Sequence, residues 1–271
     1  MSMKLSHLFF TLGIVVLTVV TGMESRIWPF CANCPKRLGE IPSVVIWAWE
    51  HNDNLEFVDP SKVAVAYYAG TIMMGRGTAT LVRRSNRLQL STHLRKFPVF
   101  RIQNCHPQES ASLAAWHAAR MLISTYMQEH PDKVVQIDCD AGLLDRQGYL
   151  RFLQELRTEL PKDTALSITA LASWCLADKW LQSAPVDETV AMVISLGKRR
   201  AQTMSIISRD GLSTGNAAVE SLGIAINEED NNRMLERLGC IRKCQRIYVF
   251  SPLGWTKARY ERVLARLRDA Q

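Results

Sequence analysis

Residues 134–141 read Val134-Val135-Gln136-Ile137-Asp138-Cys139-Asp140-Ala141 and alternate as a β-strand does. Because successive side chains of a strand point to opposite faces, Gln136, Asp138 and Asp140 share one face, and Val135, Ile137 and Cys139 share the other. Both faces of a parallel strand are usually buried, so a polar face indicates a strand whose end opens into a cleft. This stretch therefore predicts the floor of a functional site.

Strands and helices alternate on both sides of this stretch. Helical periodicity predicts helices at 110–129, 145–160, 177–182 and 256–270. Runs rich in β-forming residues predict further strands at 44–49, 63–68, 98–103, 165–171, 188–194, 221–226 and 246–250. Alternation of this kind implies βαβ units, so we expect an α/β fold, and eight strands at this length favour a (β/α)8 TIM-type barrel over a doubly wound sheet.

One insertion interrupts the alternation after the second strand. Short β-forming runs at 80–82 and 88–90 flank the polar residues 83–86, which predicts a small inserted hairpin. The nearby turn Gly75-Arg76-Gly77 lacks the further glycines and the following helix of a phosphate-binding loop, so nucleotide binding has little support.

Composition limits the class of partner. The 271 residues carry a formal charge of +7 and are 47% hydrophobic, enough for a sizeable core, and we expect residues 44–271 to form a single barrel domain. The longest basic run is only 198–200, and no arginine-aromatic pattern or nucleic-acid motif appears. We therefore expect a basic, solvated surface and no nucleic-acid partner.

The first 23 residues have the pattern of a targeting segment. Lys4 and His7 precede an apolar run at residues 8–20, and small residues follow it, as in a secretory signal peptide. A membrane anchor through residues 8–20 is the alternative, although a spanning helix needs about 20 apolar residues. We expect a periplasmic or secreted protein, or one anchored to the inner membrane, with residues 24–43 as an irregular segment before the first strand.

Two cysteine pairs flank the predicted barrel. Cys31 and Cys34 precede its first strand, and Cys240 and Cys244 precede its last. These strands are neighbours in a closed barrel, so the pairs enter at the same edge. Disulfides within or between the pairs are expected in an exported protein, and a zinc ion held by four thiolates is the alternative. A redox-responsive role is a further alternative.

Two carboxyl groups lie close together on the polar face of residues 134–141. Asp138 and Asp140 are predicted to lie about 6.5–7 Å apart by Cα. Two close carboxylates raise the pKa of one of them, which suits general acid–base catalysis. The competing interpretation is structural: Arg101 of the neighbouring strand, with Ser167 and Thr169 of the fifth strand, would hold one of them.

Tryptophans and glutamates supply further candidates at the strand ends. Trp47 and Trp49 share a face of the first strand and Trp174 follows the fifth, so these indoles are predicted either to stack on sugar rings or to fill the core. Glu50 and Glu228 are candidates for a second catalytic carboxylate, and a solvated acidic loop at 227–230 is the alternative for Glu228. The histidines lack metal-ligand spacing and no Gly-x-Ser-x-Gly motif occurs, so we expect no metal, cofactor or serine nucleophile.

Four stretches together carry a resemblance to a known family. Residues 45–49, 135–141, 166–174 and 186–192 resemble, in the right order, the bacterial family catalogued as domain of unknown function 3142. The resemblance covers most of residues 44–255. It implies a barrel related to glycoside hydrolases, and no activity comes with the family's name.

The central stretch also resembles the Asp-x-Asp-x-Glu strand of chitinase-type glycosidases. In that family, as the resemblance implies, the final acid protonates the glycosidic oxygen and the preceding aspartate supports a substrate-assisted attack. Asp138 and Asp140 occupy the first two acidic positions, whereas Gly142 occupies the third and supplies no proton donor.

These observations predict an exported glycoside-hydrolase-like barrel that acts on or binds a polysaccharide at the C-terminal ends of its strands. Asp140 with Glu50 or Glu228 would be acid and base, with Asp138 beside them. Trp47, Trp49, Trp174, Arg101 and Gln136 would contact the sugar. The alternatives are a non-catalytic carbohydrate-binding or envelope scaffold, and an envelope protein whose cysteine pairs hold a metal or respond to redox.

Overall fold

The computed structural model describes residues 36–130, 132–177, 180–194, 202, 205, 219–226 and 246–269. Eight parallel strands form a closed barrel in which β1 pairs with both the second strand and the last. The barrel strands are β1 (Val44–Ala48), β3 (Val63–Met74), β6 (Lys96–Asn104), β7 (Val134–Cys139), β8 (Ala165–Leu171), β9 (Glu188–Met192), β10 (Val219–Ala225) and β11 (Arg246–Phe250). The predicted α/β barrel is therefore confirmed.

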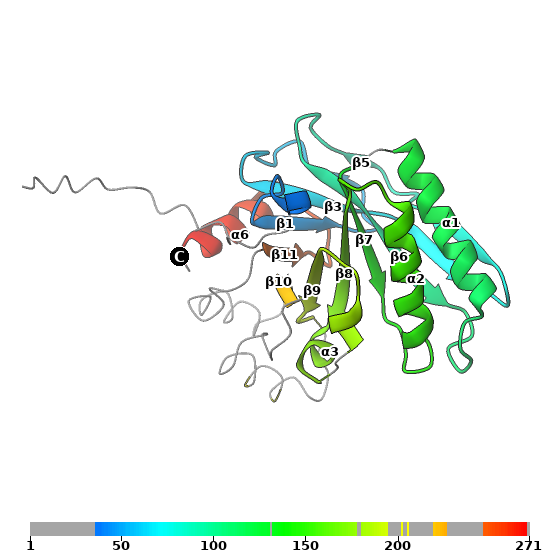
Figure 1. Ribbon diagram of the computed structural model, residues 1–271. Coiled ribbons are helices and arrows are strands. Elements are labelled where there is room, and N and C mark those ends of the chain that lie inside the picture. Colours follow the sequence, from blue (N-terminus) through cyan, green and yellow to red (C-terminus); the bar gives the residue numbers. More distant parts are fainter. Residues whose placement is uncertain are drawn as a thin grey trace, which may run out of the picture. The chain divides into compact units, whose positions relative to one another are not determined.

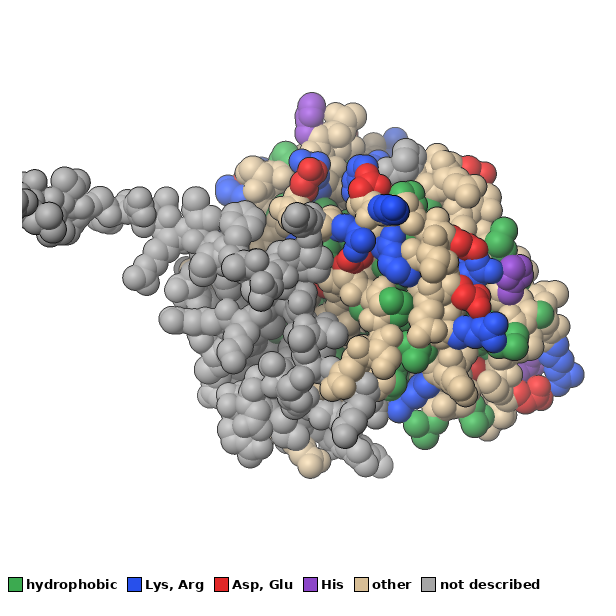
Figure 2. Space-filling model, viewed as in Figure 1, with side chains coloured by type: hydrophobic (Ala, Val, Ile, Leu, Met, Phe, Trp, Pro, Cys, Tyr) green, Lys and Arg blue, Asp and Glu red, His purple; other side chains and the backbone are tan. Residues whose placement is uncertain are grey.

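Helices cover the outside of the barrel. Figure 1 shows α1 (Leu113–Glu129) and α2 (Arg146–Glu159) side by side outside β6 and β7, and charged side chains are interspersed over this face in Figure 2. The Ser112 hydroxyl caps α1 by accepting from the Ala115 N–H at 3.2 Å. Around the helix expected at 177–182, the described residues form α3 (Ala172–Ala177) and η2 (Trp180–Ser183), and residues 178–179 lie outside the described ranges. The terminal helix is α6 (Lys257–Asp269), and η1 (Lys36–Leu38) precedes β1.

The insertion after β3 is present, but its pairing differs from the prediction. The strand β3 continues to Met74, past the end of β1, and β4 (Ala79–Arg83) pairs antiparallel with this extension. The short β5 (Leu88–Gln89) pairs with β2 (Asp53–Asn54) rather than with β4. A Cβ at Gly70 would lie 2.5 Å from the Val82 carbonyl oxygen, so only glycine allows β4 to lie this close to β3.

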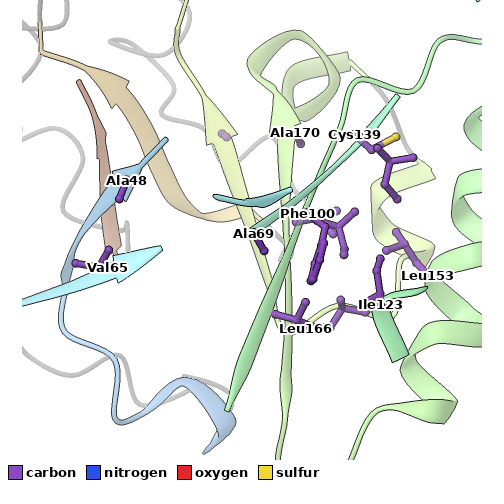
Figure 3. Close-up of a cluster of buried hydrophobic side chains, with 14 of the residues drawn as sticks. Ala48, Val65, Ala69, Phe100, Ile123, Cys139, Leu153, Leu166 and Ala170 are labelled. Carbon is purple, nitrogen blue, oxygen red and sulfur yellow. The ribbon is translucent and has the colours of Figure 1, made fainter. Parts of the chain in front are cut away.

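The apolar face of each strand packs against the helices. Val135, Ile137 and Cys139 point outward from β7 and are at most 4% exposed. Figure 3 shows Phe100, Ile123 and Leu153 lying together between the barrel and the helices α1 and α2. Burial of this apolar face supplies the main stabilisation of the fold, at about 25 cal/mol for each Å² removed from water.

The inside of the barrel contains a buried carboxylate. Glu188 accepts hydrogen bonds from the hydroxyls of Ser167 (2.9 Å), Ser221 (2.6 Å) and Tyr248 (2.6 Å), and from Arg246 Nη1 at 3.2 Å. Burial, followed by the negative charge of Glu188, raises the pKa of Tyr248 well above its usual range, so its hydroxyl remains a donor. This polar cluster links four strands, β8 to β11.

The cysteine and leader predictions fall largely outside the described residues. Cys31, Cys34, Cys240, Cys244 and residues 1–23 all lie there. Of the other cysteines, Cys139 and Cys175 are buried and Cys105 is exposed. Among the helices in the described ranges, none has the length and apolar character to cross a membrane.

Candidate active site at the C-terminal mouth

The candidate site lies at the C-terminal ends of the barrel strands, which we call the mouth. Side chains reach it because inward-pointing positions alternate along each strand and the last of them meets the opening. The mouth residues are Trp49 and Glu50 after β1, Tyr68 on β3, Arg101 on β6, Asp138 and Asp140 from β7, Thr169 on β8, Met192 on β9 and Phe250 on β11.

Asp138 is a buried carboxyl group at this opening. It is 8% exposed, and its Oδ1 accepts a hydrogen bond from Thr169 Oγ1 at 2.6 Å. Burial raises the pKa of Asp138 and outweighs the hydrogen bond from Thr169, which lowers it; the charge of Asp140 raises this pKa further and the charge of Arg101 lowers it. Asp140 follows the end of β7 and is exposed. The two carboxyls therefore differ in environment, as an acid–base pair requires.

Arg101 faces Asp138 from the neighbouring strand. The two residues are register partners in β6 and β7, so the prediction that they share the inner face is confirmed. Its positive charge lowers the pKa of Asp138, yet among the described residues Arg101 forms no ion pair with Asp138 or Asp140. Because Arg101 is exposed, its guanidinium is open to a ligand.

Tyr68 extends the polar groups toward β1. Its hydroxyl lies 2.8 Å from Thr71 Oγ1, and the ring is 3% exposed. Burial raises the pKa of Tyr68, the negative charge of Glu50 adds to this, and Arg101 opposes it. Neighbouring groups on four consecutive barrel strands therefore lie close enough to shift one another's pKa, in the order Glu50, Tyr68, Arg101 and Asp138.

An aromatic wall adjoins these polar groups. The half-buried indole of Trp49 lies 5.0 Å from the ring of Tyr68 and 6.3 Å from that of Phe250, measured between centroids. Met192 and Phe250 are also half-buried and pack with Trp49 against the inner core. An apolar ring face beside carboxyl groups is the surface that a sugar ring fits.

Two of the predicted sugar contacts lie beneath the mouth. Trp47 is 3% exposed, and its Nε1 donates to Gln136 Oε1 at 2.8 Å. Gln136 is fully buried and donates through Nε2 to Ser167 Oγ at 3.0 Å. A Cβ at Gly223 would meet the Trp47 ring at 2.7 Å, so the indole fills the space that this glycine leaves. Both side chains are placed as core residues.

Two other predicted residues are not brought to the mouth by the described structure. Trp174 is 6% exposed and packs between Trp180, 5.6 Å away, and the guanidinium of Arg146, 5.4 Å away. Its indole offers no open face for a sugar. Glu228 lies outside the described residues.

Gly142 occupies the position where the chitinase-like pattern has its acid. It lies in the loop between β7 and α2, and a Cβ added there would meet nothing within 4 Å. The structure therefore has room for a side chain at position 142, but the glycine there supplies none.

The inserted segment holds the β1 side of the mouth. Arg84 donates to the carbonyl oxygens of Ala48, Trp49 and His51, and Asn86 Nδ2 donates to that of Glu50 at 2.8 Å. Four consecutive carbonyls that follow β1 are thus bound by two side chains, which we call the Arg84 clasp. The clasp fixes the backbone that carries Trp49 and Glu50.

Sequence reasoning did not single out Tyr68, Met192 and Phe250. Met192 and Phe250 are the last inward positions of β9 and β11, and Tyr68 is the inward position of β3 level with the end of β1, so alternation within these strands was the signal that could have found them. Within the described ranges, no cluster of three or more His, Cys, Asp or Glu side chains could hold a metal ion.

The strand order and the mouth define a closed (β/α)8 barrel with its candidate site at the C-terminal ends of the strands. Solved structures with the same fold include the catalytic domain of a family GH18 chitinase from the fern Peteris ryukyuensis (TM-score 0.52, 10% identity, 84% of this chain and 98% of that one). A chitinase from Rhizomucor miehei is equally similar (TM-score 0.52, 9% identity, 83% and 99%). At these identities the likeness establishes the fold alone.

A more distant structure is the spore cortex-lytic enzyme SleL of Bacillus cereus, at TM-score 0.44 and 13% identity. This chain spans about half of it (51%), and 68% of this chain is covered. No protein-family model matches the sequence, and no curated protein matches it.

Proposed function

We propose that this chain is an exported member of the family of domain of unknown function 3142 that binds a polysaccharide at its mouth and cleaves it with carboxyl groups. The observation that carries the proposal is the pair of exposed carboxyls, Asp140 and Glu50, at one mouth that also holds buried Asp138 and the aromatic wall of Trp49 and Phe250. Glycoside hydrolysis requires one carboxyl to protonate the leaving oxygen and a second to act as base or nucleophile.

The roles follow from position. Asp140 is the exposed carboxyl nearest the opening, and Glu50 reaches the mouth from β1 on the other side of Tyr68 and Arg101. In the proposed reaction one of them protonates the glycosidic oxygen as the bond breaks, while the other removes a proton from the attacking water. Asp138 and Arg101 hold the charge balance around Asp140.

A non-catalytic carbohydrate-binding scaffold is the second candidate. Gly142 favours it, because the acid of the chitinase-like pattern is missing there while the aromatic wall and the polar groups remain. Asp138, Asp140 and Arg101 would then orient the sugar by hydrogen bonds alone.

A glycan panel tests both candidates. The purified chain, Asp140→Asn and Gly142→Glu are incubated with chito-oligosaccharides, peptidoglycan fragments and neutral glucans, and binding and reducing ends are measured. Catalysis predicts turnover that falls by about 10²- to 10⁴-fold in Asp140→Asn. Binding without turnover supports the scaffold, and neither binding nor turnover rejects both.

Export is tested separately. The apolar run at residues 8–20 motivates it. Expression of the full chain, followed by cell fractionation and N-terminal sequencing, should recover a periplasmic or secreted form that lacks the leader, or a membrane-bound form that keeps it. A cytoplasmic protein with an intact N-terminus would reject export.

A further inference from the structure

A second concave site lies at the opposite end of the barrel from the mouth. This base groove has a volume of about 850 Å³ and is formed by the segment around η1, the loop before β6, the start of β7 and the loop before β8. Ligand sites in proteins usually measure roughly 300–1,000 Å³. The groove shares no residue with the mouth, so it is independent of the proposed function.

Most of the charged side chains in the groove are basic, and two of the basic ones form no ion pair with a described residue, although the charge of Lys96 acts on Asp132 and opposes the rise in pKa that burial causes there. Its walls carry five basic side chains, those of Arg37, Arg95, Lys96, Lys133 and Lys162. Figure 2 shows basic and acidic side chains gathered over the turn between α2 and β8. Arg37 pairs with Asp187, Arg95 with Glu40 and Lys133 with Asp163. The side chains of Lys96 and Lys162 form no ion pair with any described residue.

The groove also carries three carboxylates, those of Glu40, Asp132 and Asp163. Asp132 accepts from the Tyr67 hydroxyl at 3.0 Å. These carboxylates would repel a densely charged polyanion. They can accept hydrogen bonds from hydroxyl groups, so the mixture fits a ligand that has both well-spaced negative charges and hydroxyls.

The apolar part of the groove is recessed. Leu94 is 5% exposed and Val134 1% exposed. The large apolar side chains that are exposed in the described ranges belong to other segments: Val82, Leu113, Met121, Leu143, Leu144 and Leu253. A membrane-binding face presents apolar side chains to the lipid, so this end of the barrel favours a ligand that enters the groove.

We propose that the base groove binds an acidic oligosaccharide. Its carboxylates pair with Lys96 and Lys162, its hydroxyls donate to the groove carboxylates, and a sugar face rests on Ile41, which lines the groove and is half-buried. The site would let the protein bind an acidic polysaccharide at the end of the barrel away from the mouth, whatever the mouth binds.

Titration of the full chain with short oligogalacturonates tests the proposal by calorimetry at low and moderate salt. The test variant is Lys96→Gln/Lys162→Gln, and the matched control is Arg87→Gln/Arg262→Gln, which loses the same charge from exposed positions outside the groove. We expect binding that weakens with salt. The test variant should lose about tenfold in affinity, and the control less than about twofold. Circular dichroism melts establish that both variants are folded.

Three results would overturn the proposal. They are no binding of oligogalacturonate by the wild-type chain, an equal loss in both double variants, and binding only to phosphatidylglycerol vesicles that depends on Lys96 and Lys162. The second result would mean that net charge alone attracts the ligand, and the third that this end of the barrel meets a membrane.

Discussion

Asp138 is a mouth residue whose burial disfavours its charged form. Burial, with the charge of Asp140, keeps its proton bound to a higher pH than in the unfolded chain, where the ordinary Asp value of 3.8 applies. The folded state therefore binds more protons between these two pKa values. Stability consequently falls as the pH rises through this window, because the charged form is favoured only in the unfolded chain.

Asp138→Asn should remove this pH-dependent loss while keeping an oxygen that accepts from Thr169. We expect the variant to exceed the wild type in free energy of unfolding by roughly 1–3 kcal/mol at about pH 7. The difference should disappear at about pH 3, where the carboxyl is protonated in both states. Urea denaturation across this range measures it.

Asp140→Asn is the matched control, because this exposed carboxyl should change stability by less than about 0.5 kcal/mol. Parallel pH profiles for wild type and Asp138→Asn would contradict the assignment, since they would mean that the pKa of Asp138 is the same in the folded and the unfolded chain.

The sequence predicted part of the site at the residue scale. Alternation along 134–141 was enough to place Asp138 on the inner face, and the same parity placed Arg101 beside it. Alternation could not distinguish Trp49, which borders the mouth, from Trp47, which lies beneath the mouth. Depth along the barrel axis depends on the stagger of neighbouring strands, and that is a property of the closed ring.

Among the elements, α1 and α2 pack through a glycine. A Cβ at Gly148 would lie 2.4 Å from Trp116 Nε1, and that indole is itself packed against Tyr149 and Phe152 at centroid distances of 5.9 and 5.5 Å. Gly148→Ala should therefore destabilise the protein by about 1–3 kcal/mol, although alanine is the better helix former by up to about 1 kcal/mol.

Urea denaturation of Gly148→Ala alongside Gly142→Ala separates packing from backbone effects. Nothing lies within 4 Å of a Cβ at Gly142, so that variant should be neutral or slightly stabilised. Equal midpoints for the two variants would show that Trp116 moves aside without cost.

The Arg84 clasp is a second feature at the element scale. Lysine has one compact ammonium group and cannot span three carbonyl oxygens as a guanidinium does. Arg84→Lys should therefore release the backbone after β1, and the amide hydrogens of His51 and Asp53 should exchange faster. The free energy of unfolding should fall by about 1–3 kcal/mol. Glycan binding through Trp49 and Glu50 should weaken. Arg87→Lys is the control, because only the backbone of Arg87 contacts this region. Unchanged exchange in Arg84→Lys would show that the clasp is dispensable.

Local patterns were enough to predict most of the elements. The eight barrel strands fall within a few residues of their predicted positions, except that β3 runs six residues further, to Met74. The pairing of the insertion was mispredicted for the same reason, since β4 joins an edge that exists only because β3 outruns β1. Which edge a short strand joins is decided by tertiary structure rather than by its own residues.

At the scale of the whole barrel, a polar network crosses an interior that is otherwise apolar. Through Ser167 the carboxylate of Glu188 is linked to Gln136, and through Gln136 to Trp47 on β1. Arg246 donates to the Leu38 carbonyl at 2.7 Å, which ties η1 to the same network. Hydrogen bonds of this kind require β1 and the strands from β7 to β11 to keep one register, so the network specifies how these strands close the ring as well as stabilising it.

Glu188→Gln tests this role. The substitution removes the carboxylate charge that faces the guanidinium of Arg246; the side chain of Glu188 is 0% exposed and that of Arg246 is 3% exposed. The free energy of unfolding, measured by urea denaturation, should therefore fall by about 3–5 kcal/mol. Glu188→Leu/Arg246→Met removes both charges together and should recover part of that loss, which keeps the test informative where the single variant does not fold. Lys62→Gln, which breaks the exposed pair with Asp59, should cost less than about 1 kcal/mol. If Glu188→Gln cost no more than Lys62→Gln, the interior charge would be irrelevant to closure, and apolar packing of Val45, Phe97 and Val99 alone would hold the ring.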